Sequence, residues 1–420
     1  MTLRRAGVRV MYAFNRALDE GLCWTAKEVA LRAGLWLVWL CLIPVTLPLH
    51  VAGFRRLPIL TQRVGHLAAE VDCFLKKVRL GQIDSAGMRF FILAPEGKVA
   101  NDCLMDYWRE HITVVSHPIA CCLLGLMTHG PLMRHGVQNY LLAIGRAAEY
   151  FSVEAQWAER PAILKLRPEH RELGWHYLAD MGIPEGAWFV CVHARDGGYS
   201  TWDESVHDYR NMTVENLLPA MQEIVSRGGW CIRMGDTSTK PLEPMAGVFD
   251  YAHHPARSAE LDVFLCASCR FFLGNTSGLF LVGSIFGVPS ALTNQTPFAA
   301  TGFRPEDLSI PKRIRRLGQT GFMTCSEILR SPIAGFRMSR FYAEAQLELE
   351  ENSAEEIHEL VVEMLDTLDG RFHEEPDVAL YRAVFTKNLT PEHYCFGTAG
   401  KIAATFLLRH RSMFIAPVSI

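Results

Sequence analysis

The stretch "VCVHARDGGYS", residues 190–200, joins two kinds of sequence. Its first half is a short apolar run, which is typical of a strand buried on both faces of a sheet. Its second half holds a histidine, an arginine, an aspartate and two glycines. In open α/β sheets, ligands bind just beyond the carboxyl ends of the strands. The stretch therefore predicts a parallel sheet with a candidate site where this strand ends.

Strand and helix patterns alternate on both sides of this stretch. Toward the C-terminus the predicted strands are "WCIRMG", "GVFDYA", "RFFLGN" and "VPSALT", separated by the helical segments "MTVENLLPAMQEIVSRGG", "AELDVFLCASC" and "GLFLVGSIFG". Toward the N-terminus "LPILT", "MRFFIL" and "ITVVSH" predict three more strands, with a turn at residues 63–65 after the first. Such alternation is typical of βαβ units with parallel sheets. The predicted fold class is α/β, with two Rossmann-like domains facing a cleft.

The predicted organisation has five parts. They are an N-terminal amphipathic and hydrophobic membrane-associating segment (1–56), a first Rossmann-like domain (57–160), an interdomain connection (161–187), a second Rossmann-like domain (188–335) and a helical extension that packs back on the domains (336–420). In the extension, Ser353 and Glu356 have the spacing of a capping box before an amphipathic helix.

Composition bounds the class of protein. The 420 residues include 42 basic and 45 acidic side chains, for a net charge of −3, which argues against a polyanion as partner. The 12 cysteines are scattered and several lie in apolar runs, which favours buried thiols in a reducing compartment. Cys266 and Cys269 form a C-x-x-C, but without a second pair core packing is favoured over a metal or redox site.

The N-terminal segment departs from an ordinary soluble enzyme. Ala33–Phe54 carries no charge and is bounded by Arg32 and by Arg55–Arg56. Its length can cross a bilayer, yet Pro44 and Pro48 interrupt a straight helix, so a broken, monotopic insertion fits as well as a span. The alternative is a buried helical hairpin. The segment predicts a cytoplasmic protein that is peripheral or monotopic on the inner membrane.

Three strand ends of the second half carry polar turns. Their residues are His193, Arg195 and Asp196, then Arg233 and Asp236, then Asn275, Thr276, Ser277 and Gly278. A Thr–Ser turn before a helix offers hydroxyls and free N–H groups to a phosphate, and an arginine fork meets two phosphate oxygens at once. Asp236 can accept a hydrogen bond from a base or a ribose. Taken singly, each residue also fits a loop, a helix cap or a surface ion pair; three converging strand ends favour an anion site.

Several familiar motifs are absent. No G-x-G-x-x-G follows a strand, and the G-x-x-x-x-G-K-[ST] and G-x-S-x-G motifs do not occur. An Asp-x-Asp pair that would hold a divalent metal on a sugar diphosphate is missing as well. Leaving-group charge would then be neutralised by arginines and N–H groups. The sequence predicts a site with no metal and no other cofactor.

The second half resembles a known donor domain. "HARD" and "LDVFLCASCRFFLGNTSG" are similar to the signatures of fucosyltransferase-like GT-B glycosyltransferases over roughly residues 184–300, with Asp262, Thr276 and Ser277 in the matching places. "RVGHL", "LAPEGKVAND", "VHARDGGY", "DYRN", "GGWCIRMGD" and "CRFFLGNTSGL" resemble a family of bacterial glycosyltransferases from surface-polysaccharide gene clusters, over about residues 60–320. Ala-Arg-Asp replaces the Arg-Arg-Thr-Asp run of eukaryotic fucosyltransferases, which leaves the donor sugar open.

The resemblance implies a GT-B fold, a nucleotide-sugar donor and no obligatory metal. It places donor phosphate on Arg195 and the diphosphate on Thr276–Ser277, with His193 supporting the loop or the leaving group. The first half would hold the acceptor, with the candidate residues Arg63, Gly65, His66, Glu96, Lys98 and Asn101. Glu96, His66 or Asp196 can serve as general base; a local hydrogen bond for His66 and a favourable helix dipole for Glu96 are the alternatives.

The loop after the H-x-R strand ends in Tyr209, Arg210 and Asn211, and its length favours a functional role such as a lid on the donor. The predicted function is transfer of a sugar from a nucleotide sugar to a surface glycan or a lipid-linked acceptor. The main alternative is a non-catalytic sugar-nucleotide or glycan-binding subunit of a membrane-bound polysaccharide assembly complex. A structural membrane protein with a packed Rossmann-like module is a third interpretation.

Overall fold

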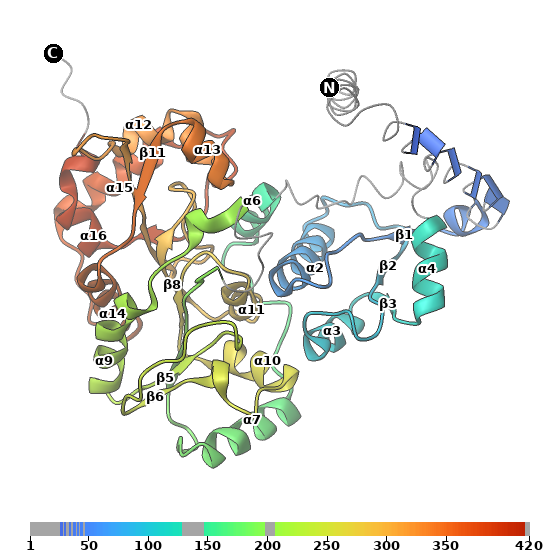
Figure 1. The fold of residues 1–420 in the computed structure, drawn as a ribbon, viewed down its shortest axis with the longest axis horizontal. Coiled ribbons are helices and arrows are strands. Elements are labelled where there is room, and N and C mark those ends of the chain that lie inside the picture. Colours follow the sequence, from blue (N-terminus) through green and yellow to red (C-terminus); the bar gives the residue numbers. More distant parts are fainter. Residues whose placement is uncertain are drawn as a thin grey trace. The chain divides into compact units, whose positions relative to one another are not determined.

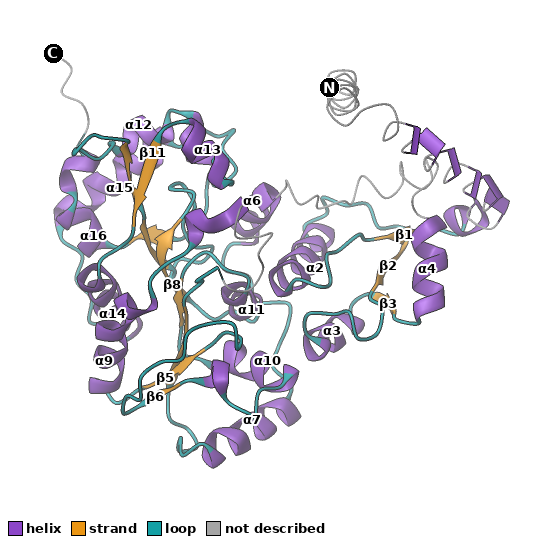
Figure 2. Cartoon of the chain, in the orientation of Figure 1, coloured by secondary structure: helices purple, strands orange, loops and turns teal. Residues whose placement is uncertain are grey.

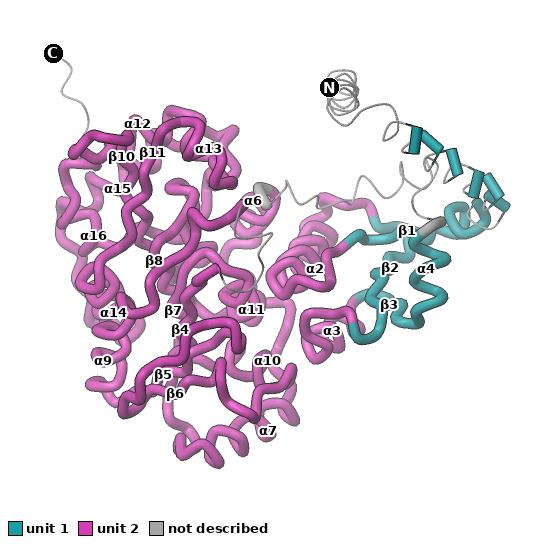
Figure 3. Tube along the Cα trace, viewed as in Figure 1, with its two compact units in different colours: residues 1–58, 85–97, 112–141 teal, residues 59–84, 98–111, 142–420 magenta. Residues whose placement is uncertain are grey.

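The computed structural model describes residues 47–127, 147–197 and 206–415, with further positions scattered over 26–44. The chain forms two compact units (Figure 3): unit 1 comprises residues 1–58, 85–97 and 112–141, and unit 2 comprises residues 59–84, 98–111 and 142–420. Both contain parallel sheets with helices, so the predicted α/β class is confirmed. The units are composed differently from the predicted domains, because residues 85–97 and 112–141 belong to unit 1 while residues 59–84 and 98–111 belong to unit 2.

Unit 1 is built on a three-stranded parallel sheet. Its strands are β1 (Phe54–Arg56), β2 (Arg89–Leu93) and β3 (Thr113–Val115), in that order, and helix α4 (Pro118–Met127) follows β3. The strand predicted at "LPILT" is wrong. Pairing ends where the N–H of Leu57 donates to the Phe91 carbonyl, because Pro58 has no N–H to continue the ladder. Among the described residues, no helix is both long and apolar enough to cross a membrane.

Unit 2 is built on a seven-stranded parallel sheet. The strands are β4 (Phe189–His193), β5 (Trp230–Arg233), β6 (Val248–Phe249), β7 (Phe272–Gly274), β8 (Ser290–Gln295), β9 (Leu308–Pro311) and β12 (Lys401–Ile402), in the order β12-β9-β8-β7-β4-β5-β6 (Figure 1). Every residue of β7, β8 and β9 is buried, as expected of strands covered on both faces. β10 (Arg313–Arg316) and β11 (Leu347–Glu350) form a separate antiparallel pair.

Helices cover both faces of the large sheet (Figure 2). The α-helices described in unit 2 are α2 (Val64–Arg79), α3 (Asp102–Arg109), α6 (Ala147–Trp157), α7 (Pro168–Asp180), α9 (Leu218–Ser226), α10 (Ala259–Ser268), α11 (Leu279–Ile285), α12 (Cys325–Leu329), α13 (Ser339–Glu344), α14 (Ala354–Leu368), α15 (Pro376–Asn388) and α16 (Ala404–Arg409). α9 packs with α14, and α10 packs with α11, α7 and α3. The predicted capping box is confirmed, since Ser353 and Glu356 begin α14.

Helices α2, α3 and α6 of the first half belong to unit 2, where α2 packs on α11 and α6. A buried ion cluster fixes α2 to α6: the Lys76 ammonium lies 2.7 Å from Asp72 Oδ2 and 2.6 Å from Glu154 Oε1. One lysine faces two carboxylates, and burial raises the pKa of Asp72 to about 7. Helix α2, whose start carries predicted site residues, is therefore held against α11 and α6 by packing within one unit.

Candidate functional site at a reversal of strand order

The site is positioned by a change of direction in the sheet. From β4 the chain proceeds through β5 and β6 toward one edge, returns to form β7 on the other side of β4, and continues through β8 and β9 toward the opposite edge. β4 and β7 are direct neighbours, with His193 opposite Gly274. Loops leaving two such strands diverge and open a crevice at their carboxyl ends, which is where open α/β sheets bind ligands. Two of the three predicted strand ends meet here.

His193 is the last residue of β4. Its Nδ1 lies 3.1 Å from the carbonyl oxygen of Met234, so Nδ1 carries the proton and Nε2 is left as an acceptor. Burial lowers the pKa of His193, and the positive charge of Arg233 lowers it further. The imidazole is therefore neutral near pH 7.

Arg195 is tied to the neighbouring strand end and to a loop. Its backbone N–H donates to Asn275 Oδ1 at 3.0 Å. Its guanidinium Nη1 donates to the His207 carbonyl at 3.2 Å and to the side-chain oxygen of Asn211. The buried Asn275 also donates through Nδ2 to the Arg210 carbonyl at 2.6 Å. These bonds join the ends of β4 and β7 to residues 207–211.

Residues 207–211 form the described end of the predicted lid, and residues 198–205 lie outside the described residues. Tyr209 is buried and its ring centroid lies 5.4 Å from that of Tyr342. The carbonyl of Asn211 accepts from Lys312 Nζ at 2.6 Å. This end of the loop is therefore attached to three strand ends, those of β4, β7 and β9.

Lys312 is a residue that the sequence reasoning missed. It directly follows β9, it is buried, and burial lowers the pKa of its ammonium group. The signal was present in "SIPK", where a lysine ends an apolar strand in the same way that His193 and Arg195 end β4. Polar residues at the carboxyl ends of β4, β5 and β7 are site candidates, and the same reasoning makes Lys312 a candidate at the end of β9.

The hydroxyls of the Thr–Ser turn after β7 differ in their bonding. Thr276 Oγ1 donates to Gln295 Oε1 at 2.9 Å, so its hydroxyl is engaged with the end of β8. Ser277 is buried and its Oγ has no hydrogen-bond partner. A buried hydroxyl without a partner costs about 1–3 kcal/mol, so it is a position where a ligand oxygen would be favourable. Gly278 then begins α11 without a side-chain cap.

The start of α2 touches this turn. A Cβ placed on Gly65 would lie 2.7 Å from Gly278 Cα, and one on Gly278 would lie 2.9 Å from the Gly65 nitrogen. Only glycine at both positions allows this backbone contact. α2 begins at Val64, two residues earlier than the predicted turn at 63–65 allows, and Arg63 does not cap it through a side-chain hydrogen bond. Residues predicted separately for the acceptor and the donor thus lie together, at two uncapped helix starts.

Arg233 has a different environment from the one predicted. Its side chain is buried, with 1% of the residue exposed. Nη1 donates to Asp250 Oδ1 at 2.9 Å and Nη2 donates to the Lys240 carbonyl at 3.0 Å. The guanidinium is therefore occupied by partners within the sheet region, and a phosphate would have to displace them.

Two predicted carboxylates are also engaged. Asp236 Oδ1 accepts from the Ser238 N–H at 2.8 Å and from its hydroxyl, which closes a local turn. Asp262 lies in α10 and accepts from the Tyr251 hydroxyl at 2.8 Å. Burial raises the pKa of Asp262. Asp262 thus joins α10 to the segment after β6 through the tyrosine.

The predicted acceptor residues separate into structural and exposed groups. Asn101 is buried, caps α3 by accepting from the Leu104 N–H at 2.7 Å, and donates to the Ala259 carbonyl at 3.0 Å. His66 Nδ1 lies 2.9 Å from Glu70 Oε1, which matches the local hydrogen bond expected at a helix start. Lys98 is exposed.

The remaining two base candidates are exposed. Asp196 follows Arg195 in unit 2 and faces solvent, whereas Glu96 belongs to unit 1. Within the described parts of the chain, no group of three or more His, Cys, Asp or Glu side chains is arranged to hold a metal ion. The C-x-x-C cysteines, Cys266 and Cys269, are buried as core thiols.

No protein-family model matches the sequence, and no curated protein matches it. Among solved structures, the chain is similar to the ADP-heptose LPS heptosyltransferase II of E. coli, with 13% identity and a TM-score of 0.37 over 57% of this chain and 84% of that one. A family 9 glycosyl transferase from Veillonella parvula DSM 2008 matches with 12% identity and a TM-score of 0.36, over 57% and 80%. The iron-containing dodecameric glycosyltransferase TibC from enterotoxigenic E. coli H10407 matches with 12% identity and a TM-score of 0.31, over 57% of each chain. The chain is thus distantly similar in structure to these glycosyltransferases.

Proposed function

We propose that the protein is a glycosyltransferase that uses a nucleotide-sugar donor and binds the donor diphosphate at the carboxyl ends of β4 and β7. The observation that carries this proposal is the meeting of Ser277, Gly278 and Gly65 at the reversal of strand order. Free N–H groups at helix starts and an unpartnered hydroxyl favour a phosphate oxygen. The positive end of the α2 dipole would also stabilise an anionic ligand at this place.

We assign to Arg195 the role of stabilising the negative charge that develops on the leaving diphosphate. Arg195 lies two residues beyond β4, its backbone N–H is fixed to Asn275 of the neighbouring strand end, and its guanidinium donates to the His207 carbonyl and to Asn211. A guanidinium held in this way needs little reorganisation when the glycosidic bond breaks. The neutral His193 offers Nε2 as an acceptor to a donor hydroxyl or to the loop. Catalysis then proceeds without an obligatory metal, and Asp196 or His66 takes the proton of the acceptor hydroxyl.

The proposed acceptor is a surface glycan or a lipid-linked glycan. The enzyme would lie on the cytoplasmic face of the inner membrane. This part of the proposal depends on the uncharged segment 33–54. Removal of residues 1–54 would leave nucleotide binding intact and lower the membrane-bound fraction. Aggregation and unfolding of the truncated protein would instead show that the segment is core.

Thermal shift measurements with GDP, UDP, CMP, dTDP and their sugars test the proposal. A ligand that binds only the native state stabilises it by about 2.7 kcal/mol at one hundred times its Kd. We expect one nucleotide family to raise the melting temperature, and Ser277→Ala to weaken its binding. Ser226→Ala on α9, where the hydroxyl only meets the Glu223 carbonyl, is the matched control.

Two results would count against the assignment. If none of these ligands shifts the melting temperature, the donor site is not where we place it. If Ser277→Ala binds as tightly as the parent, the hydroxyl is not a ligand. Binding without release of the free nucleotide in the presence of glycan acceptors would favour the non-catalytic binding subunit.

A further inference from the structure

Helix α4 of unit 1 is apolar all the way round. Its sequence, "PIACCLLGLM", contains no charged residue. One side packs on the small sheet: Cys121 and Leu124 contact the cluster of Phe91 and Leu93. The other side is open, with Ile119 65% exposed, Leu123 49% exposed and Cys122 exposed between them. A soluble surface helix has a polar outer face, so a helix that is apolar on both faces requires a second apolar environment.

The segment that leads into β1 also exposes apolar side chains on a helix. Its described positions are helical, and the side chains of Leu37, Leu40, Leu47 and Val51 are exposed. In unit 2 the exposed large apolar side chains occur singly, for example Leu317 before a turn and Leu380 on α15. Exposed apolar side chains on two helical segments of one small unit are unusual for a monomer in water and mark an interaction surface.

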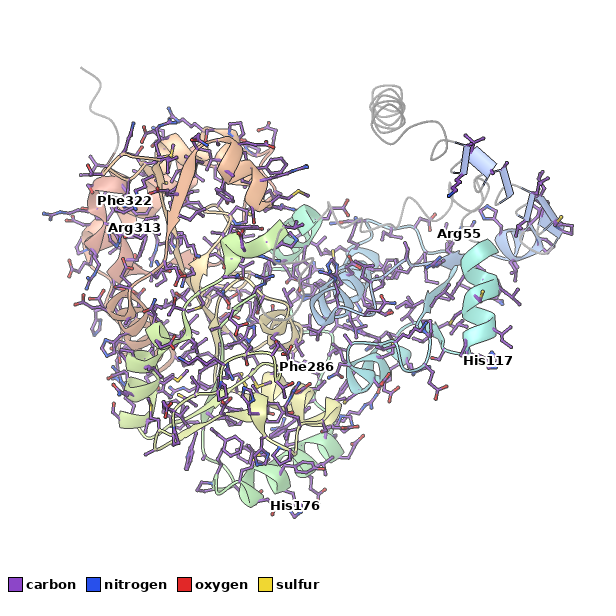
Figure 4. All side chains as sticks on the ribbon, viewed as in Figure 1. Arg55, His117, His176, Phe286, Arg313 and Phe322 are labelled. Atoms are coloured by element: carbon purple, nitrogen blue, oxygen red, sulfur yellow. The ribbon has the colours of Figure 1, made fainter. Side chains whose placement is uncertain are left out.

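The charge of unit 1 restricts the kind of partner. Over residues 47–58, 85–97 and 112–127 the described chain carries three arginines (Arg55, Arg56 and Arg89) and a single carboxylate, Glu96, for a net charge of +2, whereas the whole chain carries −3. Figure 4 shows Arg55 at β1 and His117 at the start of α4. An uncharged apolar helix beside cationic side chains is complementary to an anionic lipid surface.

We propose that α4 is a membrane-docking helix that inserts its Ile119–Leu123 face into an anionic phospholipid bilayer. At about 1.5 Å per residue, ten residues extend about 15 Å, half the thickness of the hydrocarbon core, so α4 lies in the interface and does not cross it. The exposed arginine Arg89 contacts lipid phosphates. This surface lies outside the N-terminal segment 1–56 and does not depend on the proposed donor site.

The full chain is mixed with phosphatidylcholine vesicles containing phosphatidylglycerol and a phospholipid with a photoreactive acyl chain, and labelled peptides are mapped by mass spectrometry. We expect label on residues 118–127, and none on the peptide of α15 that holds Leu380. The double variant Ile119→Glu/Leu123→Glu should lower the partition coefficient at limiting lipid about tenfold per side chain. Leu380→Glu is the matched control, because Leu380 is also 65% exposed and lies on a helix of unit 2.

Arg89→Gln should weaken binding only to vesicles that contain phosphatidylglycerol. Label confined to residues before 52, or an unchanged partition coefficient in the double variant, would overturn the proposal. A shift of the double variant from dimer to monomer in light scattering, with no label on α4, would assign the face to a second copy of the chain. If the double variant has a lower melting temperature and an unchanged partition coefficient, the Ile119–Leu123 face packs against another segment of this chain. The labelling of the parent protein needs no variant to fold.

Discussion

Arg195 and Arg233 lie near the carboxyl ends of neighbouring strands and have almost the same sequence context. Each ends an apolar run and is followed by an aspartate within three residues. Yet Arg233 is 1% exposed and paired with Asp250, whereas Arg195 is partly exposed and donates to the loop at residues 207–211. Arg233 still belongs to the strand, opposite Val192, while Arg195 lies two residues beyond its own strand. A displacement of two residues separates an ion pair inside the fold from a partly exposed side chain beyond the carboxyl end of β4.

The largest effect that would test this difference is the loss of Arg233. Arg233→Ala leaves Asp250 and the Lys240 carbonyl without their partner, and breaking a buried pair in this way costs about 3–5 kcal/mol. Urea unfolding of parent and variant measures the change. A variant that unfolds at the parent's urea concentration but no longer binds nucleotide would reverse the comparison and make Arg233 a ligand.

Arg195→Ala should act on turnover and not on folding. Loss of one charged contact to a developing anion costs about 2–4 kcal/mol in the barrier, or roughly two to three decades in rate. Arg195→Lys keeps the charge without the planar fork and should recover little activity. Single-turnover sugar transfer is the measurement, with the melting temperature of each variant recorded beside it. Transfer at the parent rate would remove Arg195 from the site, and loss of activity through unfolding alone would make it a structural residue like Arg233.

A smaller effect is expected for the partner of Arg195. Asn211→Ala removes the side-chain acceptor of the guanidinium but leaves the His207 carbonyl in place. One hydrogen bond to a charged group is worth about 1.5–3 kcal/mol, part of which the remaining acceptor retains. We therefore expect a several-fold loss of nucleotide affinity, measured by calorimetry, with the fold unchanged. Asn216→Ala, whose side chain meets only the Asn352 carbonyl at 3.4 Å, is the control; equal losses in both variants would contradict the positioning role.

The large sheet could be predicted from the sequence because its strands are buried apolar runs with turns between them. The runs that end at His193 and Arg233 form β4 and β5 as predicted, and Ser353 caps α14 as its spacing indicates. The first strand could not be placed in this way. Arg55 and Arg56 interrupt its apolar pattern, and the apolar residues after Pro58 look more like a strand than the true one does.

The site was only partly predictable, because its contacts join distant residues. Spacing identified Gly65 and Gly278 as turn residues, but their contact depends on α2 packing against α11. The pairing of Arg233 with Asp250 depends on where the segment after β5 turns back. α4 escaped notice for another reason: an uncharged run normally indicates a buried helix, and only the structure shows that half of it is exposed.

The smallest expected effect concerns His193, the last residue of β4, beside the strand β5 that carries Arg233. Burial and the charge of Arg233 lower the pKa of His193 below its ordinary value of 6.5. The unfolded chain therefore binds a proton that the folded chain does not, in the interval between that lower pKa and 6.5. Stability should be fully present above pH 6.5 and should fall as the pH drops through this interval. His193→Gln, which keeps a donor for the Met234 carbonyl without titrating, should flatten this part of the curve of melting temperature against pH. Arg233→Met in the same measurement should raise the lower limit of this interval and so make the fall smaller, because the neighbouring positive charge is gone. An unaltered pH curve in both variants would show that the imidazole and the Arg233 guanidinium are not coupled, and that the ends of β4 and β5 are electrostatically independent.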